Sequence, residues 1–224
     1  MYEVEIKTLL GSRERADELK RRLVQLFPAL TVLPPHKQRN FYFNTPKDLS
    51  VVERVIKLFL PEEKKAALAK IIRSAKTGVS IRTRDADGKS LFIIKASIGD
   101  DTSDNGVLRV EFEEEVQLSF DKLNQKLLDA GLTYQAKWSR EREHYDLGGI
   151  HITIDKNAGY GYLAEFEKMI DDGRESEYAK QELKALMTEL NCSELPQDRL
   201  ERMFTFYNEH WPEYYGTDKV FVVE

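Results

Sequence analysis

The sequence predicts an α+β fold in which one antiparallel sheet is flanked by helices. Segments with strand-like alternation, beginning with MYEVEIK at residues 1–7, are interspersed with segments of helical period. No Gly/Ser-rich or Pro-rich linker and no repeat of about 20 to 50 residues interrupts the 224 residues. We therefore predict one domain over residues 1–224, with a helical extension from about residue 174.

The first half of the chain is predicted to form, in order, a strand, a helix, a strand and two helices: residues 1–7, 12–27, 38–46, 49–59 and 61–75. Ser12 is a candidate N-cap of the first helix, which has Ala16, Leu19, Leu23 and Leu26 on one face. The second strand is aromatic and stops at Pro46, and Pro61 starts the last of these helices. These signals place the boundaries of each element.

The second half is richer in strands. The candidate strand segments are residues 78–97, 106–116, 141–155 and 159–169. The first is expected to be a hairpin turning at Asp87-Gly88, and a helix over 119–132 begins at Ser119 and ends near Gly131. Residues 174–211 have a helical pattern, which completes the α+β order.

Charged residues alternate along nearly every predicted strand. In the first, Glu3, Glu5 and Lys7 share one face and Val4 and Ile6 share the other. The same spacing of two recurs on the later strands, at Arg82 and Arg84, at Arg109, Glu111 and Glu113, at Arg140 and Arg142, and at Glu165 and Glu167. Lys95 ends an apolar strand, and Asp155 is a polar position that alternates with Ile152 and Ile154. On any single strand, the charged face can be explained as the side of an antiparallel sheet that is exposed to solvent. The repeated pairs favour a barrel whose charged faces line one lumen.

Acids and bases together in such a lumen predict a particular ligand. Clustered carboxylates hold Mg²⁺ or Mn²⁺, whereas Arg and Lys neutralise phosphate oxygens. A polyphosphate bound as its metal complex requires both at once.

Several other classes are not expected. The 34 Lys and Arg residues against 39 Asp and Glu give a net charge of −5, so no basic excess indicates nucleic acid. The single Cys192, the lack of an export signal and the lack of an apolar span predict a cytoplasmic protein away from membranes. The four histidines lack zinc-site spacing, and His151 is expected to be a hydrogen-bonding neighbour. No Walker-type loop or Gly-x-Ser-x-Gly elbow occurs.

The charged motifs resemble those of the CYTH family of triphosphate tunnel metalloenzymes, over most of the chain up to about Met169. Its opening Glu-x-Glu-x-Lys resembles Glu3, Glu5 and Lys7. Its later motifs resemble, in family order, Arg82 and Arg84, Lys95, Arg109-x-Glu111-x-Glu113, Arg140 and Arg142 before Tyr145, and Asp155 followed by Glu165-x-Glu167.

The resemblance implies a closed antiparallel barrel of about eight strands that forms a tunnel, with helices outside. It implies phosphate binding by Lys7, Arg82, Arg84, Lys95, Arg109, Arg140 and Arg142. It implies Mg²⁺ or Mn²⁺ binding by Glu3, Glu5, Glu111, Glu113, Asp155, Glu165 and Glu167. Lys7 and Tyr42 resemble the residues implicated in activating water, although a simple phosphate clamp is an equal reading of Lys7.

Three functions stay open at this point. A metal-dependent triphosphatase acting on tripolyphosphate, thiamine triphosphate or a nucleoside triphosphate leads. A class IV adenylyl cyclase would use the same residues, and a non-catalytic polyphosphate-binding module is the third. The C-terminal aromatics Trp211, Tyr214 and Tyr215 could plug a tunnel mouth or form a homodimer surface, but we expect them to pack internally.

Overall fold

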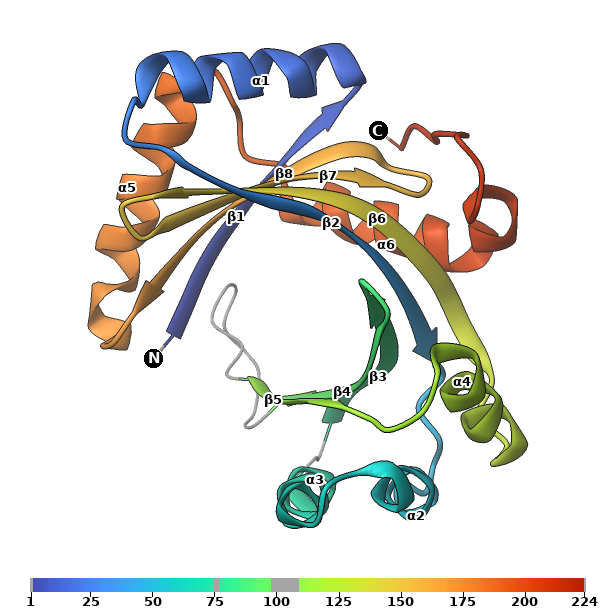
Figure 1. Cartoon of the computed structure of the whole chain (residues 1–224). Coiled ribbons are helices and arrows are strands. Elements are labelled where there is room, and N and C mark those ends of the chain that lie inside the picture. The colour runs from blue at the N-terminus through green and yellow to red at the C-terminus, as the bar shows by residue number, and fades with distance from the viewer. Residues whose placement is uncertain (1, 75–76, 98–108, 224) are drawn as a thin grey trace. The chain divides into compact units, whose positions relative to one another are not determined.

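A computed structural model describes residues 2–74, 77–97 and 109–223 and confirms the α+β class (Figure 1). The strands are β1 (Tyr2–Gly11), β2 (Thr31–Phe43), β3 (Thr77–Ala86), β4 (Lys89–Ser97), β5 (Arg109–Glu115), β6 (Tyr134–Leu147), β7 (Ile150–Asn157) and β8 (Gly161–Ile170). The α-helices are α1 (Arg13–Leu26), α2 (Ser50–Ile56), α3 (Glu62–Ser74), α4 (Phe120–Asp129), α5 (Ser176–Glu189) and α6 (Gln197–Tyr214). No described helix has the length and apolar character needed to span a membrane.

The eight strands form one sheet in the order β1-β8-β7-β6-β2-β3-β4-β5. The pairs β1–β8, β7–β8, β6–β7, β2–β3, β3–β4 and β4–β5 are antiparallel. The chain divides into two compact units, residues 1–37 with 139–224 (unit 1) and residues 38–138 (unit 2). The single domain over residues 1–224 stays a prediction.

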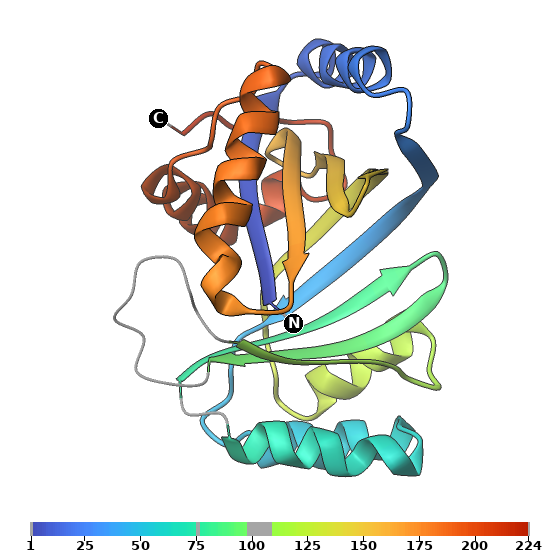
Figure 2. The ribbon, with the colours of Figure 1, turned by 90° about the vertical axis from the view of Figure 1, so that its left-hand side faces the viewer.

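In unit 1, helices α1 and α5 cover one face of the sheet (Figure 2). Ile6 of β1, Ile152 of β7 and Phe166 of β8 are at most 3% exposed and pack in one cluster with Leu19 of α1 and Leu183 of α5. Because strand side chains alternate, the neighbours of these apolar residues lie on the opposite face. That face carries the charged residues of β1, β7 and β8.

Unit 2 has the same construction. Helix α4 contacts β3 and β4, and α3 contacts β5. Phe92, Ile94 and Leu123 are fully buried in its core, and the hydroxyl of Thr83 donates to Oδ1 of Asn124 at 2.6 Å. The predicted turn lies at Asp87 and Gly88, both with positive φ. Arg82 and Arg84 alternate with Ile81 and Thr83, which places them on the face away from α4.

Of the three C-terminal aromatics, Tyr214 packs against Phe221, as expected, whereas internal packing of the partly exposed Trp211 and Tyr215 stays a prediction. Phe221 lies 4.9 Å from Tyr160 and 5.4 Å from Tyr214 between ring centroids, and its N–H donates to Gly159. A Cβ at Gly159 would lie 2.9 Å from the Phe221 ring, and φ at this residue is +78°. Glycine is therefore required where the tail crosses the β7–β8 turn.

Three predicted boundaries were wrong. Segment 141–155 is a hairpin rather than one strand, because Gly148 and Gly149 with positive φ form a turn. The segment predicted to be helical, 174–211, is interrupted after α5, where Asn191 has a φ of 58° and Leu195 donates its N–H to the Lys7 carbonyl. Strand β2 starts at Thr31, before its predicted start, because its first half is exposed and contains prolines that hide the pattern.

One predicted core residue was also wrong. Leu26 is 40% exposed at the end of α1, whereas Ala16, Leu19 and Leu23 are buried as expected. The side chain of Ser12 accepts a hydrogen bond from the Arg15 N–H, which confirms the N-cap.

Candidate functional site

The charged face of unit 1 comprises Glu5, Lys7, Arg140, Arg142, Asp155, Glu165 and Glu167. Register aligns these residues across the strands: Lys7 lies opposite Glu165, Glu5 opposite Glu167, and Arg142 opposite Asp155. The alternation noted in the sequence therefore brings residues far apart in the chain onto one surface.

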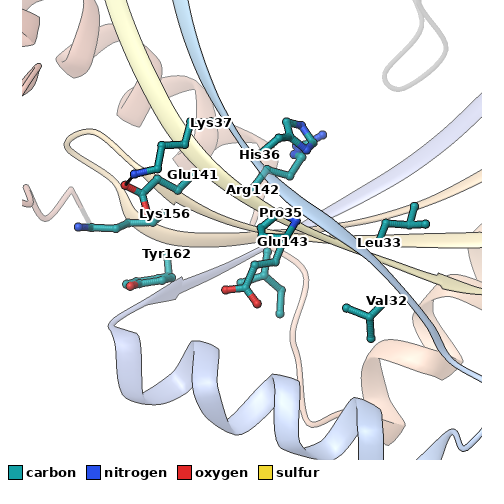
Figure 3. A pocket seen from close by; sticks show the side chains of 11 residues that line it. Val32, Leu33, Pro35, His36, Lys37, Glu141, Arg142, Glu143, Lys156 and Tyr162 are labelled. Carbon is teal, nitrogen blue, oxygen red and sulfur yellow. Dashed lines mark hydrogen bonds and ion pairs between the residues drawn. The ribbon is translucent and has the colours of Figure 1, made fainter. Parts of the chain in front are cut away.

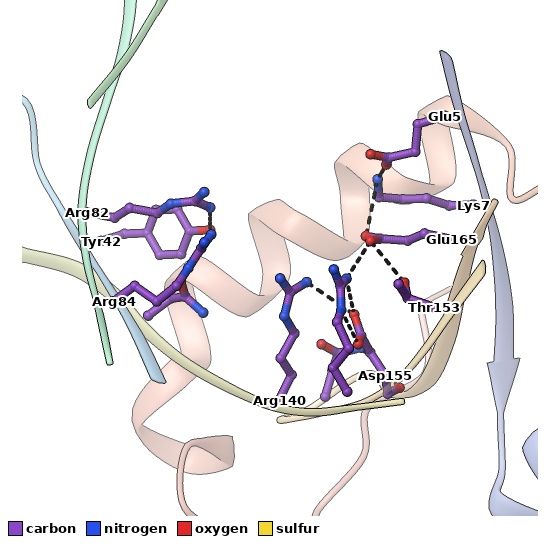
Figure 4. Close-up of polar contacts among 12 residues, drawn as sticks. Glu5, Lys7, Tyr42, Arg82, Arg84, Arg140, Thr153, Asp155 and Glu165 are labelled. Carbon is purple, nitrogen blue, oxygen red and sulfur yellow. Dashed lines mark hydrogen bonds and ion pairs between the residues drawn. The ribbon is translucent and has the colours of Figure 1, made fainter. Parts of the chain in front are cut away.

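Six of these side chains form a continuous network of ion pairs (Figure 4): Glu5, Lys7, Glu165, Arg142, Asp155 and Arg140. Lys7 Nζ contacts the carboxylate of Glu5 and lies 3.4 Å from Glu165 Oε1. Arg142 Nη2 donates to Glu165 at 2.6 Å and to Asp155 at 2.7 Å, and Arg140 Nη1 donates to Asp155 at 3.1 Å. Three cations alternate with three carboxylates, so the network is internally neutral before any ligand binds.

Burial makes this network stronger than a surface one. The side chain of Asp155 is 2% exposed, and those of Arg142 and Glu165 are 15% and 16% exposed. Burial lowers the pKa of Arg142, but its bonds to Asp155 and Glu165 outweigh this and raise the pKa overall. The guanidinium therefore stays charged and fixed, with a planar geometry that suits bidentate binding of oxygens.

The Glu165 carboxylate is strongly biased toward its ionised form. Burial raises its pKa, but Lys7, Arg142 and Arg140 together lower it from an ordinary value of 4.5 to about 2. At neutral pH the ionised Glu165 carboxylate can therefore coordinate a metal ion through its oxygens.

This pKa shift predicts a pH dependence of stability. Because the folded pKa lies below the unfolded one, the stabilisation is complete above about pH 4.5 and is lost as pH falls toward 2. The shift is equivalent to about 3 kcal/mol in the free energy of unfolding. The free energy of unfolding, measured with urea, should be lower at pH 3 than at pH 6 in the wild type. This difference between the two pH values should be smaller in Glu165→Gln. An equal loss in both proteins would contradict the assignment.

The donors on this face are those that Mg²⁺ or Mn²⁺ prefers. Within the described ranges, no three His, Cys, Asp or Glu side chains come close enough to form a metal site on their own. However, Glu5 of β1 is directly opposite Glu167 of β8. Like charges in such a cross-strand pair repel unless a cation lies between them, so this pair fits a divalent metal.

Unit 2 carries a second charged face, on which Tyr42, Arg82, Arg84, Lys95 and Glu113 lie. Arg82 Nη1 donates to the Tyr42 hydroxyl at 2.9 Å, and Arg84 donates through Nη1 to Glu113 Oε1 at 2.8 Å. The strand register places Arg82 opposite Tyr42. Both guanidiniums are thus oriented by neighbours within the unit.

Two positioning residues stand out on these faces. Asn40 is 2% exposed, and its Oδ1 accepts from Arg84 Nε at 3.0 Å. Thr153 is 5% exposed, and its hydroxyl lies 3.4 Å from Glu165 Oε2 (Figure 4). Thr153 was not predicted to be a site residue, although its alternation with Ile152 and Ile154 places it on the charged face.

Three predicted site residues have side chains outside the described part of the structure: Glu3, Arg109 and Glu111. Their backbones are described, and the register pairs Glu3 with Met169, Arg109 with Ser97 and Glu111 with Lys95. Their predicted roles stay predictions.

A separate cavity of about 330 Å³ lies in unit 1 (Figure 3). Its walls include Val32, Leu33, Glu141 and Tyr162, and among the predicted site residues only Arg142 lines it. Its lining is part apolar and part charged pairs, such as Lys37 with Glu141 at 3.0 Å. The cavity therefore does not coincide with the charged network.

A family model for the CYTH domain matches residues 1–199. The chain belongs to the CYTH family. Members of this family bind triphosphates, generally with divalent metals, and hydrolyse them or act as adenylyl cyclases. The charged motifs at Glu5, Arg82, Arg142 and Glu165 all lie within the matched range, and the tail and all but the first three residues of α6 lie beyond it.

Solved structures share the fold at low sequence identity. The PH1012 protein of Pyrococcus horikoshii is 16% identical, with a TM-score of 0.57, over 88% of this chain and 93% of that one. A protein of Vibrio parahaemolyticus described as a candidate adenylate cyclase is 18% identical, with a TM-score of 0.58, over 92% and 98%. No curated protein matches the chain in sequence. These similarities establish the fold. They do not identify the substrate, which has to be inferred from the residues of the site.

Proposed function

We propose that this CYTH protein is a divalent-metal-dependent triphosphatase that hydrolyses the terminal phosphoanhydride bond of a triphosphate-containing substrate. The observation that carries the proposal is the network Lys7–Glu165–Arg142–Asp155–Arg140. In this network, acidic and basic side chains are buried and paired with one another on one face of the sheet. Charged side chains on an ordinary solvated face are exposed and do not need such partners. Phosphate oxygens and metal ions are the ligands that use both signs of charge.

The cations would bind the phosphate chain. Arg140 and Arg142 lie two residues apart on β6, and their guanidiniums converge on Asp155, so both can contact one phosphate chain. Arg82 and Arg84 repeat this spacing on β3. The proposal includes closure of the sheet into a tunnel in which both sets of cations, with Lys95 and Arg109, serve one substrate. The family membership supports this part.

The carboxylates would hold Mg²⁺ or Mn²⁺. Glu5 and Glu167 form the cross-strand pair, and Glu165 adds an ionised oxygen pair that Lys7 and Arg142 orient. Asp155 makes three hydrogen bonds with Arg140 and Arg142, so its proposed part is to position those arginines as well as to bind metal. The metal, when bound, would neutralise phosphate charge and help to orient the substrate.

Water would be the nucleophile in the chemical step, and the protein would position it. The reaction breaks one P–O–P bond and releases phosphate and pyrophosphate from tripolyphosphate. The Tyr42 hydroxyl accepts from Arg82, so its own proton remains available to a water or phosphate oxygen. Lys7, held between two carboxylates, is placed to bind a phosphate oxygen or the attacking water. Positioning and charge neutralisation account for most catalysis of phosphoryl transfer.

A turnover assay with resolved products tests the proposal. Tripolyphosphate, ATP and thiamine triphosphate are supplied separately with Mg²⁺ or Mn²⁺, and phosphate, pyrophosphate and cyclic AMP are quantified. We expect phosphate release that EDTA abolishes. Cyclic AMP with pyrophosphate would instead assign the cyclase reaction, and tight binding without any turnover would assign a binding module; either result would contradict the triphosphatase.

A further inference from the structure

The C-terminal tail of unit 1, residues 215–223, contacts the hairpin formed by β7 and β8 (Figure 1). The N–H of Phe221 donates to the carbonyl of Gly159 in the β7–β8 turn at 2.9 Å, and Val220 forms a parallel bridge with the same glycine. Asp218 accepts from Lys156 Nζ on β7, also at 2.9 Å. Three contacts of the tail therefore fall on one hairpin.

The ring of Phe221 is the main attachment of the tail. It is 7% exposed, whereas its neighbours Val220 and Val222 are 51% and 81% exposed. Four aromatic rings lie around it, with centroid distances of 4.9, 5.0, 6.3 and 5.4 Å: Tyr160 of the turn, and Phe206, Tyr207 and Tyr214 of α6. Because aromatic side chains bury a large apolar area, this cluster joins the turn to α6 through one residue of the tail.

The sequence of the β7–β8 turn favours flexibility. Gly159 and Gly161 have φ values of +78° and +71°, and glycine has more backbone freedom than any other residue. The surrounding rings are close to this backbone, because a Cβ at Gly159 would lie 2.8 Å from the Tyr207 ring and 2.9 Å from the Phe221 ring. The tail and α6 therefore restrict a turn that its own residues leave free to move.

The same hairpin carries two carboxylates of the charged face of unit 1. Asp155 lies two residues before the end of β7, and Glu165 lies four residues after the start of β8. Arg142 donates to Asp155 at 2.7 Å and to Glu165 at 2.6 Å. A shift of the turn would therefore move Asp155 and the guanidinium that it holds. Residues that orient a metal or phosphate site in this way affect its affinity without contacting the ligand.

We propose that Phe221 is a positioning residue, whose ring fixes the β7–β8 turn and thereby holds Asp155 and Glu165 in the geometry that the charged face requires. The family match ends at residue 199, so this attachment lies beyond the matched range. The inference rests on the proposed triphosphatase function and adds to it a positioning element outside the charged face.

Hydrogen exchange followed by mass spectrometry tests whether the ring holds the hairpin. In Phe221→Ala, the amides of residues 151–168 should exchange on the order of tenfold faster or more, because the turn loses its packed support. The amides of β3 and β4 in unit 2 should exchange as in the wild type. Val222→Ala, next to the ring but 81% exposed, is the matched control and should change neither region. Unchanged exchange of the hairpin in Phe221→Ala would overturn the inference.

The metal requirement tests whether this support acts on the site. The Mg²⁺ concentration that gives half-maximal phosphate release should rise about tenfold in Phe221→Ala, and Phe221→Leu should recover part of the loss. A mere loss of folded protein would lower the maximal rate and leave that concentration unchanged. Ile56→Ala, at a fully buried position of α2 in unit 2, is the destabilised control and should lower Tm only. An unchanged Mg²⁺ requirement in Phe221→Ala, or an equal rise in Ile56→Ala, would overturn the inference.

Two alternatives keep the test decisive. If the wild type turns over no triphosphate, the triphosphatase proposal fails, and Mn²⁺ binding is then measured by electron paramagnetic resonance. Weaker binding by Phe221→Ala than by the wild type and Ile56→Ala supports the positioning role, whereas equal affinities, or binding by none of the three, overturn it. If Phe221→Ala does not fold, Tyr214→Ala removes a partly exposed ring of the same cluster and replaces it in each comparison, with the same criteria.

Discussion

Replacing Glu165 by glutamine is expected to lower kcat for the triphosphate substrate by on the order of 100-fold or more. Glu165 is the residue that joins Lys7 to Arg142, and these cations hold its pKa well below the ordinary value. Glutamine has nearly the same shape, but it cannot neutralise a metal ion and it leaves the two cations without their shared partner. Phosphate release measured at saturating substrate and metal provides the test.

Two further variants separate a site effect from a folding effect. Glu5→Gln should produce a loss in the same direction, and Glu5 is more exposed, at 29%, so its cost in stability is smaller. Glu182→Gln removes a carboxylate that pairs with Lys168 on the helical side of unit 1 and should leave turnover unchanged. Circular dichroism and Tm confirm that each variant folds. Full activity in both Glu5→Gln and Glu165→Gln would contradict metal binding by these residues.

Arg142→Ala is expected to have the largest effect on stability, lowering the free energy of unfolding by about 3 kcal/mol or more. Its guanidinium makes bonds of 2.6 to 2.7 Å to Glu165 and Asp155, and the Asp155 side chain is only 2% exposed. Removing the cation leaves Arg140 as the remaining partner of a buried carboxylate. Urea denaturation measures the loss, and the KM for triphosphate should rise in the same variant.

Arg174→Ala is the matched control for this prediction. Arg174 also pairs with an aspartate, Asp172, but it is 90% exposed. Exposed ion pairs contribute little, so the free energy of unfolding should change by less than about 0.5 kcal/mol. Equal effects of the two substitutions would show that the buried network does not contribute to stability.

Strand alternation explains why much of the charged face could be predicted from the sequence. Glu5 and Lys7 flank the buried Ile6, and Asp155 follows the buried Ile154, so period-two spacing alone assigned their faces. Spacing could not reveal which residues lie opposite each other. That Glu165 pairs with Lys7 in register, and that Arg142 holds two carboxylates, depends on strand order and on contacts between distant segments.

The missed features have the same origin. Strand β2 was predicted only from residue 38 because Pro34 and Pro35 contradict a strand pattern, although an exposed strand tolerates them. The hydrogen-bonding role expected for His151 is confirmed, since its Nδ1 lies 3.2 Å from His144 Nε2. This partner was not anticipated, because seven residues separate the two histidines and the intervening Gly148-Gly149 turn brings them together. Residues 141–155 were predicted to form a single strand, so the turn within this segment, and the contact across it, were overlooked.

The most direct test of the central claim is the metal dependence of phosphate release from tripolyphosphate and ATP by the full chain. Turnover is measured as Mg²⁺ or Mn²⁺ is titrated into metal-free protein, with Glu165→Gln alongside. The account predicts no release without metal, a saturable rise with metal, and little or no rise in the variant. Equal release with and without metal, or an identical titration for wild type and Glu165→Gln, would contradict it.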